Sequence, residues 1–489
     1  MILSKIIKAV NPEKVAGRQD LEISSVEFDS RKVLPGALFV AIPGYKTDGN
    51  AYIGAAVKAG AVAVIAGKDS ETGVTFIKVN EPRAALAAAA AEFFDNPSGK
   101  LIMAGITGTS GKTTTTYLLR SIFRKHGEKT GLIGTIEYDL DGEIFESKNT
   151  TPESLTLQEL LGRMVQKGFN ACVMEVSSHS LALHRVDGIE FDAAVFLNLT
   201  QDHMDFHGSF EEYLGAKIKL FGLLAGNKHG PKICAVNADD PRAAEFVKAA
   251  SATVLTFGFN EGADLRAIAV CNAPSGLNFV IKHGNGVCSL ELKLKGVYNA
   301  YNAMAAAAVA AGLKIGWETI KAGLEAVENV PGRFEAYKSP AGFTAVVDYA
   351  HKPDALERLL SAVRGMGARK IITVFGCGGE RDRTKRPMMG KISERFSDLT
   401  VVTSDNPRSE DPSAIIAEIT AAMDKTKYLI LADRKRAIYE AVARAKSGDV
   451  VVVAGKGHEE YQLIGGKTKH FSDKETVLEA IAAGGKWKE

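Results

Sequence analysis

The sequence is poor in cysteine and has no long apolar run, and both absences narrow the class of protein. Its five cysteines among 489 residues are scattered, odd in number and without a Cys-x-x-Cys pair. This pattern argues against a disulfide framework and against a zinc site. No segment has the roughly 18 uninterrupted apolar residues of a membrane span, and the first residues lack an apolar region with a cleavage site. We therefore expect a cytoplasmic protein without membrane insertion.

The chain also lacks an excess of charge of either sign. Its formal net charge is +2, and no basic run is long enough for a nucleic-acid patch, so we expect no nucleic-acid partner. Apolar residues are plentiful, at 46% of the sequence, which is enough to build several cores. At this length, three domains are the natural expectation.

The most informative motif is the segment Gly105-Ile-Thr-Gly-Thr-Ser-Gly-Lys-Thr-Thr-Thr115. An apolar stretch precedes it and a helix-like stretch, Thr113 to Arg124, follows, which is the order of a phosphate-binding loop. Glycines let backbone N–H groups surround a polyphosphate, and the helix N-terminus attracts its charge. Lys112 is placed to reach the terminal phosphates. Ile106 stands where the ordinary Walker pattern has its first glycine, but the segment still predicts ATP binding.

Two clusters of helix- and strand-breaking residues divide the chain. They are Asp95-Asn-Pro-Ser-Gly99 and Val330-Pro-Gly-Arg333, and they predict domains over 1–98, 99–332 and 333–489. In the second and third of these domains, short apolar strands alternate with helices, which favours largely parallel sheets. The predicted fold class is therefore α/β, in three domains.

Polar residues follow two predicted strands of the second domain. Glu175-Val-Ser-Ser-His179 comes after one strand and Asn198-Leu-Thr-Gln-Asp-His203 after another. Ligands of open α/β sheets bind at the carboxyl ends of the strands, so we expect both segments beside the phosphate loop. Glu175 and His203 are candidates for a Mg²⁺ shell. The alternatives are a helix cap or salt bridge for Glu175 and an ordinary loop hydrogen bond for His203.

Four polar loops follow strands in the third predicted domain, at 348–353, 376–383, 404–408 and 455–460. Arg381 and Arg408 suit a carboxylate, because a guanidinium group can bind one bidentately. Glu459 suits an ammonium group. Together these side chains predict an amino-acid site, and the alternative is a set of surface loops with ordinary ion pairs.

The ordered set of motifs resembles the Mur ligases of bacterial cell-wall synthesis over essentially the whole chain. It also includes Tyr298-Asn-Ala-Tyr-Asn302, Gly332-Arg333, Asp348-Tyr-Ala-His351, Asp405-Asn-Pro-Arg408 and Gly455-Lys-Gly-His458. The resemblance implies a small N-terminal UDP-substrate domain, a central P-loop ATPase-like domain with a mainly parallel sheet, and a C-terminal Rossmann-like amino-acid domain.

The resemblance also implies an activity. It is ATP- and Mg²⁺-dependent amide formation, in which meso-diaminopimelate joins the D-glutamate of UDP-MurNAc-L-Ala-D-Glu through an acyl phosphate. Such a ligase acts in peptidoglycan synthesis, and so in cell shape and division. We expect it to be a monomer.

Roles carry over by position. The catalytic residues implied are Lys112, Glu175, His203 and Lys217. ATP is expected against Thr107, Gly108, Thr109, Ser110, Gly111, Lys112, Thr113, Thr114, Asn302, Arg333 and Asp348. The metal is expected against Thr113, Glu175, His203 and Lys217 as a carbamate. The uridine end is expected against Ser30, Tyr45, Lys46 and Thr47, and the muramoyl peptide against Thr150, Thr151, Ser177 and Arg185. Diaminopimelate is expected against Arg381, Asp405, Asn406, Pro407, Arg408, Gly455 and Glu459.

Three positions need comment. From the sequence alone, Lys217 is expected to be a solvated helix lysine. Only the resemblance makes it a carbamate, with Lys219 as the rival. Leu183 stands where some relatives carry Gln, which leaves that substrate contact open. Arg408 goes with diaminopimelate in this family. Lysine lacks the distal carboxylate and would bring like charge to this arginine.

Three rival hypotheses accompany this interpretation. A sister ligase, adding L-lysine or acting as a folylpolyglutamate synthetase, disagrees with the Asp-Asn-Pro-Arg run and with the N-terminal domain. A P-loop switch or transport ATPase would hydrolyse ATP without a carboxylate and an amine. A non-enzymatic relative is expected to lose Lys112 or Glu175, and both are present.

Overall fold

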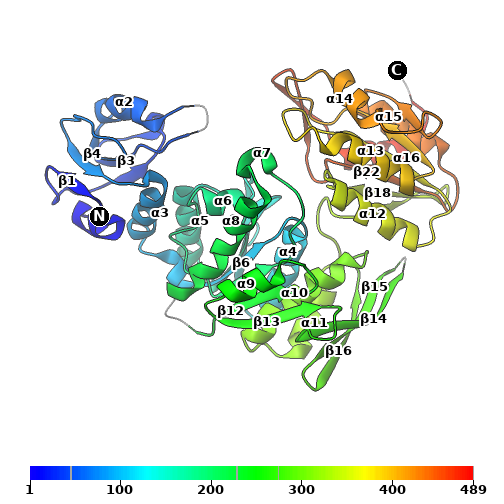
Figure 1. Cartoon of the computed structure of the whole chain (residues 1–489), viewed down its shortest axis with the longest axis horizontal. Helices are drawn as coiled ribbons and strands as arrows, with labels where there is room; N and C mark the ends of the chain where they lie inside the picture. Colours follow the sequence, from blue (N-terminus) through cyan, green and yellow to red (C-terminus); the bar gives the residue numbers. More distant parts are fainter. Residues whose placement is uncertain (45–46, 227–229, 274, 488–489) are drawn as a thin grey trace.

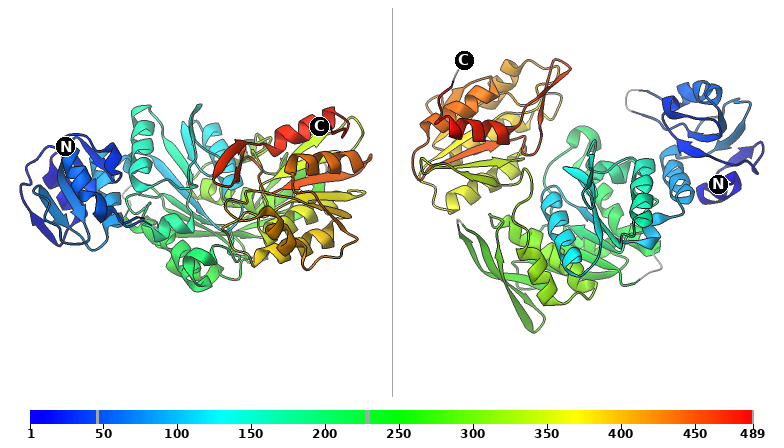
Figure 2. Two further views of the ribbon diagram at one scale, coloured as in Figure 1. Left: turned by 90° about the horizontal axis from the view of Figure 1, so that it is seen from above. Right: turned by 180° about the vertical axis from the view of Figure 1, so that it is seen from behind.

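The computed structural model describes residues 1–44, 47–226, 230–273 and 275–487. Three α/β domains follow one another, with the central domain lying between the other two (Figures 1 and 2). Their sheets have five, eleven and six strands, and the predicted three-domain α/β fold is confirmed. No helix formed by the described residues combines the length and apolarity needed to cross a membrane.

The N-terminal domain is built on a five-stranded sheet in the order β1-β5-β4-β3-β2. Alanines of the last helix pack closely on this sheet, with Ala85 and Ala89 buried beside Leu38 and Ile65. The strands are β1 (Lys14–Ala16), β2 (Ser25–Glu27), β3 (Ala37–Val40), β4 (Ala61–Ala66) and β5 (Thr75–Lys78). The helices are α1 (Leu3–Val10), η1 (Ser30–Lys32), η2 (Gly49–Tyr52), α2 (Ile53–Lys58), α3 (Pro82–Phe93) and η3 (Pro97–Lys100).

The central domain holds the large sheet, in the order β16-β15-β14-β13-β12-β11-β6-β10-β7-β8-β9. Strands from β7 to β14 across the middle pair in parallel, and the outer strands pair antiparallel. The strands are β6 (Ile102–Thr107), β7 (Thr130–Ile133), β8 (Glu137–Leu140), β9 (Glu143–Glu146), β10 (Ala171–Glu175), β11 (Ala193–Phe196), β12 (Ile233–Asn237), β13 (Thr253–Gly258), β14 (Leu265–Ala273), β15 (Gly276–His283) and β16 (Gly286–Leu292).

Helices cover both faces of this sheet. Ala104 and Ile106 of β6 contribute to one core, and Met103 contributes to the core on the other face, as strand alternation requires. The helices are α4 (Lys112–Lys125), α5 (Ser154–Gln166), α6 (Ser178–Ala182), α7 (Met204–His207), α8 (Phe210–Gly222), η4 (Leu223–Gly226), α9 (Ala243–Ala249), α10 (Tyr298–Gly312) and α11 (Trp317–Glu325). Strand β6 runs further into the glycine motif than the apolar stretch suggests, because it pairs with β10 and β11 up to Thr107.

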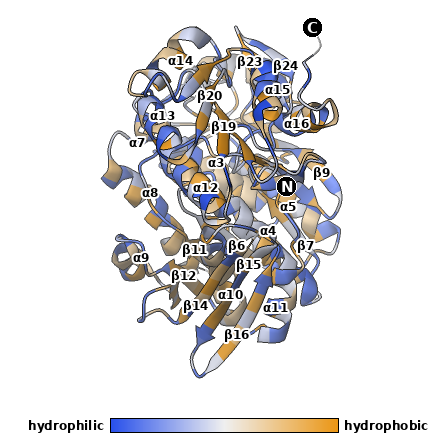
Figure 3. Ribbon diagram, turned by 90° about the vertical axis from the view of Figure 1, so that its right-hand side faces the viewer, coloured by the Kyte–Doolittle hydropathy of each residue, from blue (hydrophilic) through white to orange (hydrophobic). Residues whose placement is uncertain are grey.

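The C-terminal sheet has the order β17-β18-β22-β19-β20-β21, in which only β17 is antiparallel to its neighbour. The strands are β17 (Glu335–Lys338), β18 (Thr344–Asp348), β19 (Ile371–Phe375), β20 (Leu399–Val402), β21 (Tyr428–Ile430) and β22 (Val450–Ala454). A separate hairpin joins β23 (Tyr461–Ile464) to β24 (Lys467–His470). The helices are α12 (Pro353–Gly365), α13 (Lys385–Phe396), α14 (Pro412–Thr420), α15 (Arg434–Arg444) and α16 (Asp473–Ala482). In Figure 3, α12 shows both apolar and polar positions, and its Leu356, Leu359 and Leu360 are buried.

Candidate active site

The predicted phosphate loop connects β6 to α4. Gly111 lies immediately before the helix with φ +91°, and a Cβ there would lie 2.4 Å from the side-chain oxygen of Asn302. Glycine is therefore required both for the left-handed backbone and for the close approach of α10. The loop lies at the carboxyl end of a central parallel strand, where the doubly-wound architecture places ligands.

Glu175 ends β10, next to β6, and points at this loop. It is 1% exposed, and its Oε1 accepts hydrogen bonds from Thr113 Oγ1 at 3.0 Å and from the Thr135 amide at 2.8 Å. Its Oε2 accepts from Thr135 Oγ1 at 3.0 Å. The helix-cap and salt-bridge alternatives for Glu175 are wrong, because its partners are a loop amide and hydroxyls beside the phosphate loop.

Asn198 fixes the other side of the loop and was missed as a site residue in the sequence. Its side-chain oxygen accepts from the Ser110 amide at 2.9 Å, and its amide nitrogen donates to the Ser110 carbonyl at 3.0 Å. The signal available in the sequence was its position shortly after β11, the strand on the other side of β6.

Lys112 begins α4, and its ammonium group lies over the loop. Nζ donates to the carbonyls of Gly108 at 2.8 Å and Thr109 at 3.3 Å. Burial, together with the charge of Lys352, lowers the pKa of Lys112 to about 8. A cation held in this way stabilises phosphate oxygens strongly, because the surroundings screen it little.

Lys217 of α8 is buried rather than solvated, so the expectation drawn from the residue alone is wrong. It is 1% exposed, and its Nζ donates to the Gly108 carbonyl at 3.0 Å. Burial holds its pKa well below the ordinary value, helped by the charges of Lys112 and Lys352. Lys219, two residues on, is exposed. The two lysines differ in burial because α8 packs against the loop with the side that carries Lys217. Sequence periodicity alone did not show which of the two lysines would be buried.

His203 lies at the mouth of the site beside an ion pair that joins two domains. Its Nε2 is 2.9 Å from Asp202 Oδ2, and Asp202 also pairs with Lys352 of the C-terminal domain. Burial lowers the pKa of His203, although Asp202 opposes this. Burial disfavours ionisation of Asp202, but Lys352 and His203 outweigh it and hold the pKa of Asp202 below its ordinary value. Neither Asp202 nor Lys352 was singled out from the sequence.

Three residues expected near the nucleotide gather around the loop from later parts of the chain. Asn302 Oδ1 accepts from Thr115 Oγ1 at 3.4 Å, and Arg333 Nη2 donates to Thr113 Oγ1 at 3.0 Å. Asp348, at the end of β18, accepts backbone N–H bonds from Phe334 and Ala350 at 2.7 and 2.8 Å. Burial raises the pKa of Asp348.

A cavity of about 1270 Å³ lies between the central and C-terminal domains. That volume suits a nucleotide and part of a second ligand, because small-molecule sites have roughly 300–1,000 Å³. The predicted site residues that line it are Thr109, Ser110, Gly111, Lys112, Thr113, Thr114, Thr150, Glu175, Ser177, His203, Asn302, Arg333 and Asp348. Thr107 and Gly108 lie directly behind the loop, and Lys217 is bonded to it.

The four residues expected at the muramoyl peptide form one connected group. Thr151 Oγ1 donates to the Glu175 carbonyl at 2.8 Å and accepts from the Ser177 amide at 3.1 Å. Thr150 Oγ1 is 3.0 Å from Thr135 Oγ1. Arg185 donates to the Thr151 carbonyl at 3.1 Å. This group joins the phosphate loop to the face of the central domain nearer the N-terminal domain.

Glu153, which was missed in the sequence, links that group to the N-terminal domain. It pairs with Arg185 at 2.8 Å and with Arg83 of α3 at 3.3 Å. Among the residues expected at the uridine end, Ser30 begins η1 and the Thr47 carbonyl accepts from Gly44, and neither lines the cavity. Tyr45 and Lys46 lie outside the described residues.

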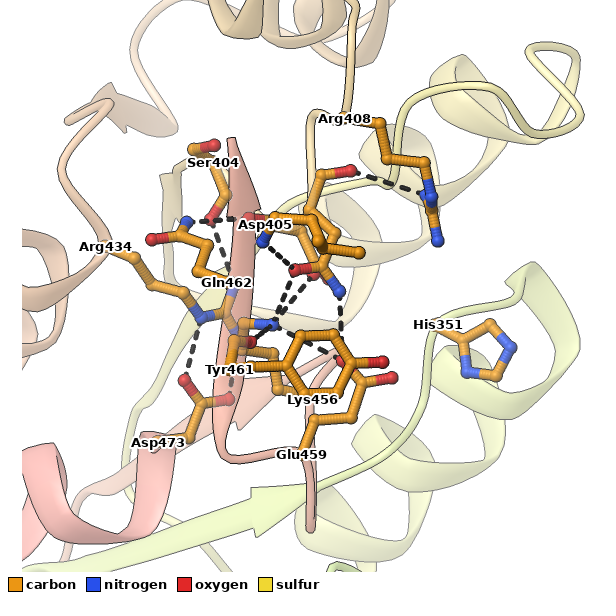
Figure 4. Close-up of polar contacts among 12 residues, drawn as sticks. His351, Ser404, Asp405, Arg408, Arg434, Lys456, Glu459, Tyr461, Gln462 and Asp473 are labelled. Carbon is orange, nitrogen blue, oxygen red and sulfur yellow. Dashed lines mark hydrogen bonds and ion pairs between the residues drawn. The ribbon is translucent and has the colours of Figure 1, made fainter. Parts of the chain in front are cut away.

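The residues expected for the amino acid lie close together on the C-terminal domain, and Figure 4 shows Asp405, Arg408 and Glu459 among them. Asp405, Asn406 and Pro407 are buried, and Asn406 donates to Glu459 Oε2 at 3.0 Å. Gly455 packs against Asp405, where a Cβ would lie 2.8 Å from the carboxylate. Burial raises the pKa of Glu459, and Lys456 opposes the rise.

Two arginines lie beside this group, and both come close to Gly378. Arg408 has φ +56°, and its Nη1 donates to the Gly379 carbonyl at 2.6 Å. Its backbone also bonds to the β23–β24 hairpin through Leu463 and Gly465. Arg381 is exposed, on the neighbouring loop. The left-handed Arg408 backbone is strained for this residue type, a feature that clusters at functional sites.

The oxygens around the phosphate loop fit Mg²⁺. Thr113 Oγ1 and Glu175 Oε1 lie 3.0 Å apart, and hydroxyl and carboxylate oxygens are ligands that this ion accepts beside phosphates and water. Among the residues that the structure describes, no group of three or more His, Cys, Asp or Glu side chains is placed to hold a metal. The predicted shell contains only two such side chains, so it does not require such a group.

Comparison with known proteins matches three family domains. These are the Mur ligase family catalytic domain over residues 22–94, the Mur ligase middle domain over 106–310, and the Mur ligase glutamate ligase domain over 332–457. A UDP-N-acetylmuramoyl-L-alanyl-D-glutamate–2,6-diaminopimelate ligase of Bacillus licheniformis is 44% identical over 98% of this chain and 99% of its own. The ligase of that name from Caldanaerobacter subterraneus is 43% identical over 99% of both chains.

Solved structures agree with these matches. A structure of a ligase with the same name has a TM-score of 0.71 and 30% identity, and covers 99% of each chain. The MurF ligase of Thermotoga maritima in complex with ADP has a TM-score of 0.65 at 22% identity, covering 94% of this chain and 97% of its own, and shows the shared fold. From its full-length similarity and its three matched domains, the chain belongs to the Mur ligase family.

Proposed function

We propose that the chain is the ATP-dependent ligase that joins meso-diaminopimelate to the D-glutamate carboxyl group of UDP-MurNAc-L-Ala-D-Glu. The observation that carries the proposal is full-length identity of 44% to a ligase named for diaminopimelate. The chain also has Arg408 at the end of its Asp-Asn-Pro-Arg loop.

The two pockets divide the reaction between them. At the phosphate loop, Lys112 and the loop amides stabilise charge on the phosphoryl group that ATP transfers to the substrate carboxylate. The product is an acyl phosphate, whose phosphate is a good leaving group. The amine held by the C-terminal pocket attacks the acyl carbon, an amide bond forms, and inorganic phosphate leaves. Thr150, Thr151, Ser177 and Arg185 would orient the peptide between the two pockets.

Thr113, Glu175 and His203 would hold Mg²⁺, which supplies charge neutralisation when bound. Lys217 is placed to join them as a carbamate. Its lowered pKa favours the neutral amine, which is the form that adds to CO₂ and releases a proton. The resulting anion would lie beside Gly108, where Nζ of Lys217 lies in this structure.

Specificity for diaminopimelate rests on charge. Arg408 and Arg381 face the pocket edge with cations that a distal carboxylate can pair with, and lysine carries an ammonium there instead. Glu459, half-buried beside Asn406, would accept the ammonium of the amino-acid end. Replacing a carboxylate by an ammonium opposite two arginines costs several kcal/mol where the groups are desolvated, on the order of ~2–5 kcal/mol.

The test is phosphate release by the purified chain with ATP, Mg²⁺ and UDP-MurNAc-L-Ala-D-Glu, with meso-diaminopimelate or L-lysine added separately. We expect release only with diaminopimelate. Release only with lysine would retain the ligase and refute the role of Arg408. Release that needs neither amine nor UDP substrate would instead identify a P-loop ATPase.

A further inference from the structure

A buried lysine among the residues expected to bind the amino acid has no role assigned to it by the reaction. Lys456 follows Gly455 and is 0% exposed. Its Nζ donates to Asn406 Oδ1 at 3.1 Å, to Glu459 Oε2 at 3.3 Å and to the Tyr461 carbonyl at 2.6 Å. It also lies 3.5 Å from Asp405 Oδ1. Three donors are thus directed at four acceptors, from the 404–408 loop, the 455–460 loop and β23 (Figure 4).

Two of these contacts converge on Glu459. Lys456 pairs with the carboxylate directly. It also accounts for the orientation of Asn406, because the Asn406 oxygen accepts from Lys456 and from the Leu463 amide at 3.0 Å. The nitrogen of that side chain is thereby turned toward Glu459, to which it donates at 3.0 Å. If Lys456 were removed, only the Leu463 amide would still hold the oxygen of Asn406 in place among these bonds.

The charges around the pocket leave one negative charge for a ligand. Asp405 and Glu459 are two carboxylates that share the single ammonium of Lys456. The next cation inward, Arg434, is engaged by Asp473, with both of its hydrogen bonds to that carboxylate at 2.8 Å and both side chains 0% exposed. Within this buried cluster, two carboxylates and one ammonium give a net charge of minus one, which an incoming ammonium group can balance. Arg408 and Arg381 lie outside the cluster, at its edge, and act on Tyr461 rather than pairing with Asp405 or Glu459.

We propose that Lys456 is a positioning residue for the amine substrate, which keeps Glu459 ionised and aimed so that it can bind the ammonium of the incoming amino acid. This inference rests on the proposed function, because it assumes that the pocket binds an amino acid. It adds to that function a cation that does not touch the substrate. The groups that face Glu459 are Lys456, Asn406, Tyr349, Asp405, Arg434 and Tyr461.

The expected pH dependence of kcat/KM follows from the directions in which burial and Lys456 shift the pKa of Glu459. Burial raises the pKa of Glu459 and Lys456 lowers it, so removing the cation raises the pKa further. A carboxyl group with a higher pKa is ionised only at higher pH. The acid limb of the kcat/KM profile for diaminopimelate should therefore move to higher pH in Lys456→Met. A residue that only supported the fold would lower activity without moving this limb.

The experiment compares five proteins in the phosphate-release assay: the unaltered chain, Lys456→Met, Glu459→Gln, the double variant and Arg369→Met. Arg369 is the matched control. It pairs with the nearly buried Asp449 at 3.0 Å, just before β19 and β22, at the opposite end of the same strands. We expect Lys456→Met to raise the KM for diaminopimelate at least about tenfold, with the KM for ATP unchanged. Arg369→Met should leave both constants unchanged.

The double variant should match Glu459→Gln, because Lys456 acts through that carboxylate. An unchanged KM for diaminopimelate in Lys456→Met, an equal rise in the KM for ATP, or a double variant about tenfold worse than Glu459→Gln would each overturn the inference. If Lys456→Met does not fold, the double variant decides. Failure of the double variant to fold as well refutes the inference, since the cation would then serve the fold. If the unaltered chain releases no phosphate with diaminopimelate, the proposed function itself is refuted.

Discussion

The phosphate loop and the proposed amine site on the C-terminal domain are built in opposite ways. The loop uses consecutive residues, with its backbone amides and Lys112 at the start of one helix. The amine site uses two separate loops, 404–408 and 455–460, and the β23–β24 hairpin, and the buried cations Lys456 and Arg434 bond to these segments and to the end of β22. The first site is therefore visible as a motif, and the second depends on groups far apart in the chain. We expect mutations to separate the two, since the proposed function assigns phosphoryl transfer to one and the choice of amine to the other.

The largest effect is expected at the loop. Lys112→Met should lower kcat by about 10³-fold, because the cation acts directly on transferring phosphate oxygens in a buried site. Lys125→Met, at the exposed other end of α4, is the control and should be neutral. The measurement is steady-state phosphate release. Near-normal turnover by Lys112→Met would remove this loop from the chemistry.

Lys217 comes next, and its neighbour provides the comparison. Lys217→Ala should lose about 10²-fold or more in kcat and recover part of it with added acetate or formate, while the exposed Lys219→Ala should behave like the unaltered chain. Mass spectrometry of the intact protein under CO₂ checks the carbamate. Full activity of Lys217→Ala without rescue would contradict its assignment.

At the amine pocket, Arg408→Met should reduce kcat/KM for diaminopimelate by about 30-fold, equivalent to about 2 kcal/mol. The KM for ATP should not change, because the phosphate loop belongs to the other domain. Arg395→Met, which removes an exposed arginine paired with Glu357 on the same domain, is the control. Equal losses for ATP and diaminopimelate would show that the two pockets are not separable.

The smallest effect is expected where the two domains meet. Burial lowers the pKa of Lys112, and the charge of Lys352 adds to this lowering, so that the pKa is about 8. A lysine binds phosphate as the ammonium, so kcat/KM for ATP should fall above about pH 8 in the unaltered chain. In Lys352→Met the pKa of Lys112 rises, and this basic limb should move to higher pH. A limb that stays in place would mean that another group controls it.

The sequence predicted the first site more completely than the second. Thr113 follows from the loop motif, Glu175 from the rule that ligands bind at strand ends, and Asn302 from the family resemblance alone. The structure brings all three to one cavity. The sequence did not single out Asp202 and Lys352, which pair across 150 residues of chain. It also did not single out Glu153, which lies between two arginines. Lys456 lies inside the motif Gly455-Lys-Gly-His458, but only its neighbours Gly455 and Glu459 were assigned a role from the sequence. The roles assigned to individual residues stay predictions until the variants are measured.

The sequence by itself determined the α/β class, the three domains and the phosphate loop, because strand and helix periodicity and glycine placement act over short stretches of chain. Only the tertiary structure decided which lysines are buried and which carboxylates they face. Lys217 is buried and Lys219 is exposed because only one side of α8 packs against the loop. Lys456 finds its partners on loops that a parallel sheet brings together. Burial and charge coupling depend on distances between residues remote in sequence, so they emerge only after the chain has packed.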